Sequence, residues 1–145
     1  MWIETAGEAT DELLDAFRRL MPQLTKNPAL PSLDEITALV RSACSTLLIA
    51  HADDNSIVGV LSLTVYRVPT GIRSIIEDVI VDESVRGQGI GKALIRRALE
   101  VAREAGAAHV TLTSNPLRSA ANLLYQKMGF IKRETNAYIY KFKKD

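Results

Sequence analysis

Three glycines placed close together mark the stretch of this sequence that is best suited to chemistry. Gly87, Gly89 and Gly91 stand within five residues, directly after Arg86 and directly before Lys92. Glycine has no Cβ, so such a backbone can approach a ligand closely and converge its N–H groups on phosphate oxygens. An amphipathic helical pattern follows, and the positive end of that helix would lie behind the anion. This stretch therefore predicts an anion-binding loop.

Two common phosphate-binding patterns do not fit this loop. A Walker A loop needs a glycine and a Ser or Thr where this sequence has Arg86 and Ala93. A dinucleotide fingerprint needs a third glycine where Lys92 stands. The loop does match Arg-x-x-Gly-x-Gly, with Arg86, Gly89 and Gly91. In this pattern the sequence resembles the GNAT superfamily of acyl-CoA N-acyltransferases.

A second pattern, in residues 120–130, resembles the Leu-Tyr-x-x-x-Gly-Phe helix of the same superfamily. Leu124, Tyr125, Gly129 and Phe130 match it, and they follow the glycine loop in the expected order. The resemblance covers most of the chain. It implies an α/β (α+β) GNAT fold with a mixed central sheet of about seven strands, helices on both faces and a splayed pair of parallel strands. It also implies a single N-acetyltransferase domain over residues 1–145.

Hydrophobic periodicity predicts the elements that would position these motifs. The expected strands are residues 2–5, 45–52, 57–68, 76–81, 109–114, 130–134 and 137–142. The expected helices are residues 9–24, ending near Pro22, a segment opened by a Ser32–Glu35 capping box, a segment from Ile90 to Gly106, and the motif helix. The segments 76–81, 90–106 and 109–114 form a βαβ unit with parallel strands. Gly59, inside a strand, marks a bulge or a close backbone approach.

Composition bounds the remaining possibilities. A chain of 145 residues with 47% hydrophobic content fits one globular domain. The net charge of +1, with mixed signs along the chain, predicts neither nucleic acid nor a membrane as partner. The single cysteine, Cys44, and an acidic start without a signal-peptide layout favour a cytoplasmic protein. His51 and His109 lack partners at ligand spacing, so no metal site is expected.

The resemblance implies acetyl-CoA as cosubstrate, with its pantetheine arm in the gap between the two parallel strands. The expected contacts are Val79, Ile80, Val81, Arg86, Gly87, Gln88, Gly89, Ile90, Gly91 and Lys92. Arg86, Lys92 and also Arg118 offer positive charge for the phosphates. The alternative for each is an ordinary solvated surface, which is the preferred interpretation of Arg118. Asn115 and Asn122 are further expected contacts. The asparagine that many family members carry seven residues before the motif tyrosine is replaced here by Arg118.

Acyl transfer from a thioester to an amine needs a base for the ammonium and an acid for the leaving thiolate. Tyr125 is the expected acid, because a phenol can protonate a thiolate with little tuning. Its alternative role is packing. Because side chains alternate along a strand, only one of Glu77 and Asp78 can face the cleft. The resemblance implies Glu77 as the base, directly or through water, because many similar acetyltransferases place a carboxylate there, and Asp78 is then structural. Alternatively, both carboxylates cap the sheet edge or pair with Arg73.

These inferences together predict an N-acetyltransferase that moves an acetyl group from acetyl-CoA to a primary amine in a ternary complex. Cys44 is expected to be a small buried residue rather than a nucleophile, which favours direct attack over an acyl-enzyme. The expected acceptor is a small-molecule amine. The alternatives are a protein N-terminus or lysine as acceptor, and a CoA-binding sensor without turnover. Members of the family often dimerise, so a homodimer is among the expected partners.

Overall fold

The computed structural model describes residues 1–143, which form two compact units, residues 1–113 and a unit that begins at Ser114. The first unit contains β1 (Trp2–Thr5), α1 (Asp11–Leu24), α2 (Leu33–Arg41), β2 (Ser45–His51), β3 (Ile57–Val68), β4 (Gly71–Val81), a 3₁₀ turn η1 (Glu83–Val85), α3 (Ile90–Glu104) and β5 (Val110–Thr111). The second unit contains α4 (Ser119–Lys127). The α/β class expected for a GNAT fold is confirmed.

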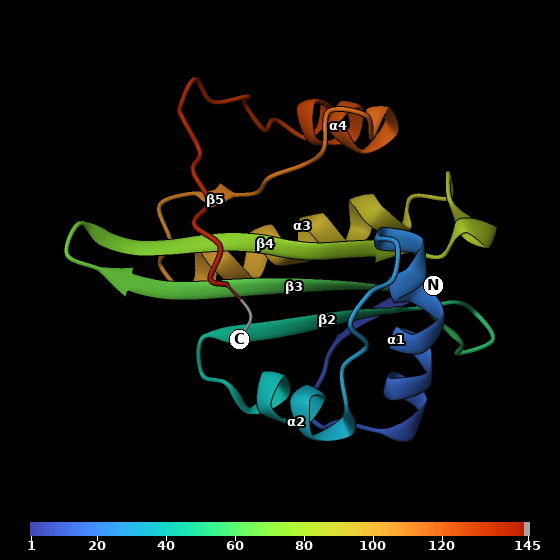
Figure 1. Ribbon diagram of the computed structural model, residues 1–145. Coiled ribbons are helices and arrows are strands. Elements are labelled where there is room, and N and C mark those ends of the chain that lie inside the picture. The colour runs from blue at the N-terminus through green and yellow to red at the C-terminus, as the bar shows by residue number, and fades with distance from the viewer. Residues whose placement is uncertain (144–145) are drawn as a thin grey trace. The chain divides into compact units, whose positions relative to one another are not determined.

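The strands lie in sequence order, β1-β2-β3-β4-β5, in one mixed sheet (Figure 1). The first three pairings are antiparallel, and β4 and β5 are parallel. The parallel connection runs through α3, which confirms the predicted βαβ unit. One crossover through α3 therefore connects the two parallel strands, and it begins with the residues that follow β4.

Helices cover both faces of the sheet. Val60 of β3 belongs to an apolar cluster with Leu13 and Leu20 of α1. At the preceding residue, Gly59, an added Cβ would lie 3.2 Å from Leu94 Cδ1 of α3. Because successive side chains of a strand point to opposite faces, α1 and α3 lie on opposite sides of the sheet. The same Cβ would lie 3.2 Å from the carbonyl oxygen of Ile80, which confirms the predicted close approach at Gly59.

Local signals set the helix ends. The Thr10 side chain accepts a hydrogen bond from Leu13 N at 3.1 Å and caps the start of α1. Pro22 lies inside the last turn of this helix, which ends at Leu24. The predicted capping box of α2 is confirmed, with bonds of 3.1 Å in both directions between Ser32 and Glu35. The end of α1 at Leu24 matches the expected bounds, and its start at Asp11 lies two residues later than expected.

The predicted count of about seven strands is wrong for the residues that the structure describes, where the sheet has five. The closing hairpin, residues 130–134 and 137–142, has no strand assignment. Alternation predicts which side of a strand is buried, but it does not supply a pairing partner. Tyr138 and Ile139, which would point to opposite faces of a strand, are 90% and 80% exposed. Neither face of this segment is therefore buried. The strand expected at residues 109–114 is reduced to Val110–Thr111.

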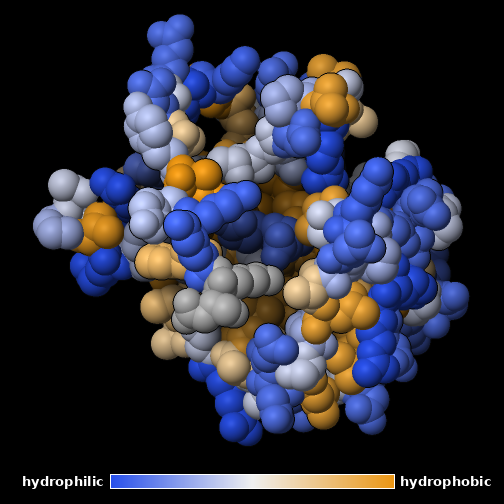
Figure 2. All heavy atoms as spheres, viewed as in Figure 1, coloured by the Kyte–Doolittle hydropathy of each residue, from blue (hydrophilic) through white to orange (hydrophobic). Residues whose placement is uncertain are grey.

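On the face shown in Figure 2, hydrophilic residues cover much of the surface and hydrophobic residues appear between them. In the first unit the exposed apolar side chains include Trp2, Leu30 and Leu33. Cys44 is also exposed, so its predicted burial is wrong. It lies in the turn between α2 and β2. No helix within residues 1–143 is long and apolar enough to cross a bilayer.

Candidate active site

A β-bulge lies in β4 where the two carboxylates stand. Glu77 pairs with Ser62 and Ile80 pairs with Val60, so two residues of β4 lie opposite one of β3. Asp78, inside the bulge, has a φ of 51°, a left-handed conformation that aspartate adopts more readily than most residues. Since Ser62 and Val60 share a face of β3, Glu77 and Ile80 also share one. Strict alternation, from which only one of Glu77 and Asp78 was expected to face the cleft, therefore does not hold here.

The face on which Glu77 lies is the one covered by α1, because Ile80 belongs to the apolar cluster formed with that helix. Glu77 and Asp78 are both exposed. Arg73, their proposed alternative partner, instead donates from Nη2 to Thr70 Oγ1 at 3.1 Å. No ion pair to either carboxylate is present among residues 1–143. The carboxylate of Glu77 is thus accessible, and its role as base stays a prediction.

The two parallel strands pair over a short stretch only. Their ladder consists of Ser74 opposite Val110 and Ile75 opposite Thr111. Ser74 is buried, and its hydroxyl donates to the His109 carbonyl at 2.7 Å, which fixes the start of the pair. From residue 76 onward no strand of the described chain pairs with this edge of β4. A free strand edge is what the predicted bonds from Val79, Ile80 and Val81 require, although those contacts themselves stay a prediction.

The glycine loop begins at Asp82, directly after β4, includes η1 and leads through its glycines into α3, as the sequence predicts. Gly87 and Gly89 have φ values of 80° and 83°, which only glycine adopts at little cost. A Cβ added at either position would meet no atom within 4 Å, so the loop surface is open. Gly89 is the N-cap of α3 and makes no side-chain cap bond. Its carbonyl accepts from Ala93 N at 3.0 Å.

The N–H groups at the start of α3 are therefore available to a ligand. The first residues of a helix have no intrahelical acceptor, which here concerns Ile90, Gly91 and Lys92. The Ile90 side chain is 5% exposed and anchors the helix start in the core. Lys92 is exposed beside these groups. An open loop, free N–H groups and a helix N-terminus together form a site suited to phosphate.

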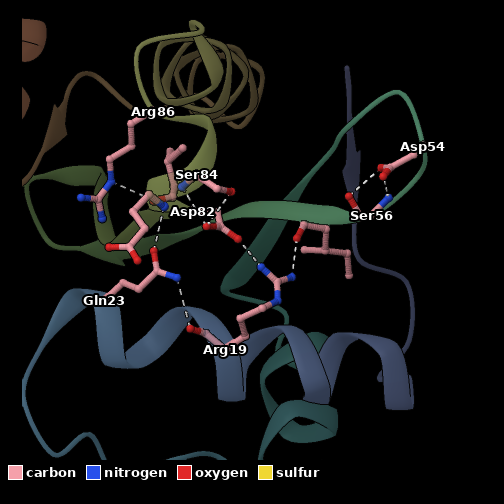
Figure 3. Close-up of polar contacts among 10 residues, drawn as sticks. Arg19, Gln23, Asp54, Ser56, Asp82, Ser84 and Arg86 are labelled. Atoms are coloured by element: carbon pink, nitrogen blue, oxygen red, sulfur yellow. Dashed lines mark hydrogen bonds and ion pairs between the residues drawn. The ribbon is translucent and has the colours of Figure 1, made fainter.

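The Arg86 side chain makes a hydrogen bond to the backbone, in addition to its predicted contact with phosphate. Its Nε donates to the carbonyl of Val81 at 3.2 Å (Figure 3). This bond ties Arg86, which directly precedes Gly87, to the end of β4. The guanidinium is exposed and carries further donors. Arg86 thus stabilises the loop, and its predicted contact with phosphate remains compatible with that position.

Polar side chains of α1 hold the start of the loop (Figure 3). Arg19 pairs with the Asp82 carboxylate and donates to the Ile57 carbonyl at 2.6 Å. Asp82 also accepts from Ser84 N at 3.1 Å and from the Ser84 hydroxyl at 3.0 Å. The Ser84 N–H bond first, and then the hydroxyl bond and the charge of Arg19, hold the pKa of Asp82 below its ordinary 3.8, although partial burial opposes this. Asp82 is therefore ionised at neutral pH.

In the second unit, Tyr125 lies near the C-terminal end of α4. Phe130 N donates to the Tyr125 carbonyl at 3.0 Å, and Gly129 N donates to the Gln126 carbonyl at 3.1 Å. Gly129 has a φ of 99°, and the rings of Tyr125 and Phe130 lie edge to face at 5.8 Å. These are the bonds and the apolar contact of a Schellman motif. The Gly-Phe pair of the sequence pattern therefore ends α4 and packs against the tyrosine.

Burial raises the pKa of Tyr125 above its ordinary 10.0, and the charge of Arg118 opposes part of this rise. The phenol is thus protonated at neutral pH, as a general acid must be. Asn122 donates from its amide to the carbonyls of Asn115 and Arg118, both at 2.9 Å. The Asn115 side chain accepts from Leu117 N at 2.9 Å. Both asparagines thus shape the turn before α4, and their contacts with CoA stay a prediction.

One cavity in the first unit, of about 380 Å³, was not expected from the sequence. Glu4, Glu8, Glu12 and His51 are among its lining residues, and no predicted site residue is. The buried His51 ring is bonded to Glu4 at 2.8 Å and stacks on Trp2 at 4.0 Å. Within residues 1–143 no group of three His, Cys, Asp or Glu side chains is disposed to hold a metal ion. Burial of a histidine is visible only in the fold.

Comparison with known proteins places these features in a family. A model described as "Acetyltransferase (GNAT) family" matches residues 10–130. A glucosamine 6-phosphate N-acetyltransferase of Trypanosoma brucei brucei is 35% identical over 127 residues, which are 83% of this chain and 84% of that protein. A probable glucosamine 6-phosphate N-acetyltransferase 2 of Oryza sativa subsp. japonica is 40% identical over 65 residues, which are 45% of this chain and 37% of that protein.

Solved structures agree with the fold. The crystal structure of an acetyltransferase of Trypanosoma brucei superposes with a TM-score of 0.76 at 30% identity and covers 97% of this chain and 99% of that chain. An aminoglycoside acetyltransferase from an uncultured soil metagenomic sample superposes with a TM-score of 0.83 at 24% identity and covers 99% and 96%. At that identity the second likeness concerns the fold alone.

Proposed function

Because the chain belongs to the acetyltransferase (GNAT) family, we propose that it transfers an acetyl group from acetyl-CoA to the primary amine of a small molecule. GNAT acetyltransferases use acetyl-CoA, and the family model spans both compact units. The observation that carries the proposal is the open glycine loop, whose Gly87 and Gly89 keep side chains away from the free N–H groups of α3. We place both units in one catalytic domain of residues 1–145.

The proposed reaction is a direct transfer. Once the ammonium has lost a proton, the amine nitrogen forms a bond to the thioester carbonyl carbon, the C–S bond breaks, and the thiolate takes a proton. The second proton, which the nitrogen loses as the amide forms, restores the acid that protonated the thiolate. Tyr125, whose phenol is protonated at neutral pH and whose pKa is raised further by burial, is assigned as the donor of the proton that the thiolate takes. Glu77, exposed and without an ion pair among residues 1–143, is assigned as the acceptor of the ammonium proton, directly or through water.

For the acceptor we infer an amino sugar. The Trypanosoma brucei brucei relative, which matches most of this chain, is a glucosamine 6-phosphate N-acetyltransferase by name. The Oryza sativa relative bears a similar name, although this chain spans only 37% of its length. A shared fold does not determine the acceptor, so the class must be tested directly.

The test is release of free thiol from acetyl-CoA in the presence of single candidate acceptors. Glucosamine 6-phosphate and glucosamine represent amino sugars, and spermidine represents another small amine. Peptides with a free N-terminus or a free lysine represent proteins. We expect release with an amino sugar. Release with the peptides alone would replace the proposal with protein acetylation. Binding of acetyl-CoA without release from any acceptor would indicate a CoA-binding sensor.

A further inference from the structure

A side chain of α1 holds the start of the glycine loop. Arg19 contacts two separate segments: Nη1 pairs with an Asp82 oxygen, and Nη2 donates to the Ile57 carbonyl at 2.6 Å (Figure 3). The Asp82 side chain is 13% exposed and that of Arg19 is 46% exposed. One planar guanidinium thus joins α1, the first residue of β3 and the residue after β4.

Gln23, one turn further along α1, contacts the next residue of the loop. Its Oε1 accepts from Glu83 N at 2.8 Å, and its Nε2 donates to the Arg19 carbonyl at 3.3 Å. Glu83 is the first residue of η1, whose N–H has no acceptor within that turn. The amide of Gln23 therefore satisfies a backbone donor that the loop itself leaves open.

Asp82 connects these contacts to the loop. One carboxylate oxygen faces Arg19, and the other accepts from the Ser84 N–H and hydroxyl. Its own N–H donates to the Val58 carbonyl at 2.8 Å. Both the side chain and the N–H of the residue that opens the loop are thus bonded within the first unit.

The glycines make such an anchor necessary. On ordering, Gly87 and Gly89 lose more conformational freedom than any other residue type would lose at these positions. At its far end the loop is anchored by Ile90, which is buried. At its near end the anchors are Arg86 and the contacts from α1. An ordered loop keeps its N–H groups directed at one point before the ligand arrives.

We propose that Arg19 and Gln23 are positioning residues for the glycine loop, holding it in the conformation that accepts the pyrophosphate of acetyl-CoA. This inference rests on the proposed function only in that acetyl-CoA is the ligand. Neither side chain is assigned a contact with the cosubstrate. Both act through Asp82 and Glu83.

The experiment compares Arg19→Gln, Gln23→Met and Arg18→Gln in the full chain. Arg18 is the matched control, because it stands next to Arg19 in α1 but, within residues 1–143, pairs only with Asp15 of the same helix, at 3.6 Å. The affinity for CoA is measured by calorimetry. The ratio of kcat/KM for acetyl-CoA to that for S-acetylpantetheine, which lacks the pyrophosphate, is measured by thiol release. Thermal unfolding is followed for each variant.

We expect Arg19→Gln to weaken CoA binding by roughly tenfold, as loss of a charge-assisted bond would do, and Gln23→Met to weaken it less. Arg18→Gln should bind as the unaltered protein does. Both positioning variants should lower the ratio of kcat/KM for acetyl-CoA to kcat/KM for S-acetylpantetheine. A general loss of structure would not change this ratio. Unchanged CoA affinity, or an equal loss for both thioesters, would overturn the inference. Failure of the unaltered protein to bind CoA would instead overturn the proposed function.

Discussion

Replacement of Gly89 by alanine tests the backbone conformation on which the anion site depends. Gly89 has a φ of 83°, and an added Cβ would meet no atom within 4 Å. The substitution therefore introduces no clash, and its only direct effect is conformational. A left-handed backbone costs an L-residue about 1–2 kcal/mol.

This free energy can appear in either of two measurements. If the substituted alanine keeps the left-handed backbone, the free energy of unfolding falls by about 1–2 kcal/mol, a shift in Tm of roughly 3–8 °C for a chain of this length. If the loop relaxes, stability is kept and binding of CoA must restore the conformation, which raises Kd by roughly 5–30-fold. The two losses together should equal the conformational cost.

The assay pairs urea denaturation with CoA calorimetry on the same preparation. Gly7→Ala is the control, because a Cβ at Gly7 also meets no atom and that residue has no left-handed φ. It should leave both quantities unchanged or slightly raise stability. Gly89→Asn should lose less stability than Gly89→Ala, since asparagine tolerates this conformation better. If Gly89→Ala changed neither stability nor affinity, the description of the loop would be refuted.

Three further predictions concern the assigned acid, the assigned base and the loop carboxylate. Tyr125→Phe should lower kcat by on the order of 100-fold with little change in the Kd of acetyl-CoA, and an unchanged kcat would remove Tyr125 from the chemistry. In the unaltered protein the protonated phenol is lost as pH rises through a pKa above 10.0, so kcat should fall only above that pH, and this fall should be absent in the phenylalanine variant. Glu77→Gln should lower kcat/KM on the order of 100-fold at neutral pH and less at high pH, where the amine loses its proton without help; a loss independent of pH would argue against a base. Because the folded-state pKa of Asp82 is lowered, its carboxylate contributes stability above about pH 4 that is lost as pH falls through the folded pKa. Denaturation of Asp82→Asn across pH should therefore show a stability difference from the unaltered protein at neutral pH that shrinks in acid, and a constant difference would contradict the ionised state assigned here.

Local features of the site could be predicted from the sequence because they depend on neighbouring residues. The glycine loop followed by α3 is encoded within residues 86–92. The capping box of Ser32 and Glu35 depends on a spacing of three. The Gly-Phe pair that ends α4 could also have been recognised as a Schellman signal, since Gly129 and Phe130 directly follow the helix.

Features that depend on distant pairing could not be predicted. The bulge at Asp78 is defined by its register with Ser62 and Val60, which a single strand does not reveal. The contact between Arg19 and Asp82 joins residues 63 positions apart. Residues 137–142 have strand-like composition but no partner within the described chain, so propensity alone overestimated the sheet.

The measurement that tests the central claim most directly is a titration of CoA followed through backbone amide resonances of the protein. We predict that the largest shifts occur at the N–H groups of Gly87 to Lys92 and of Val79 to Val81. The amides of residues 4–13, which line much of the separate cavity, should move little. Shifts confined to that cavity, or no shifts at saturating CoA, would contradict the assignment of the glycine loop as the site of the cosubstrate.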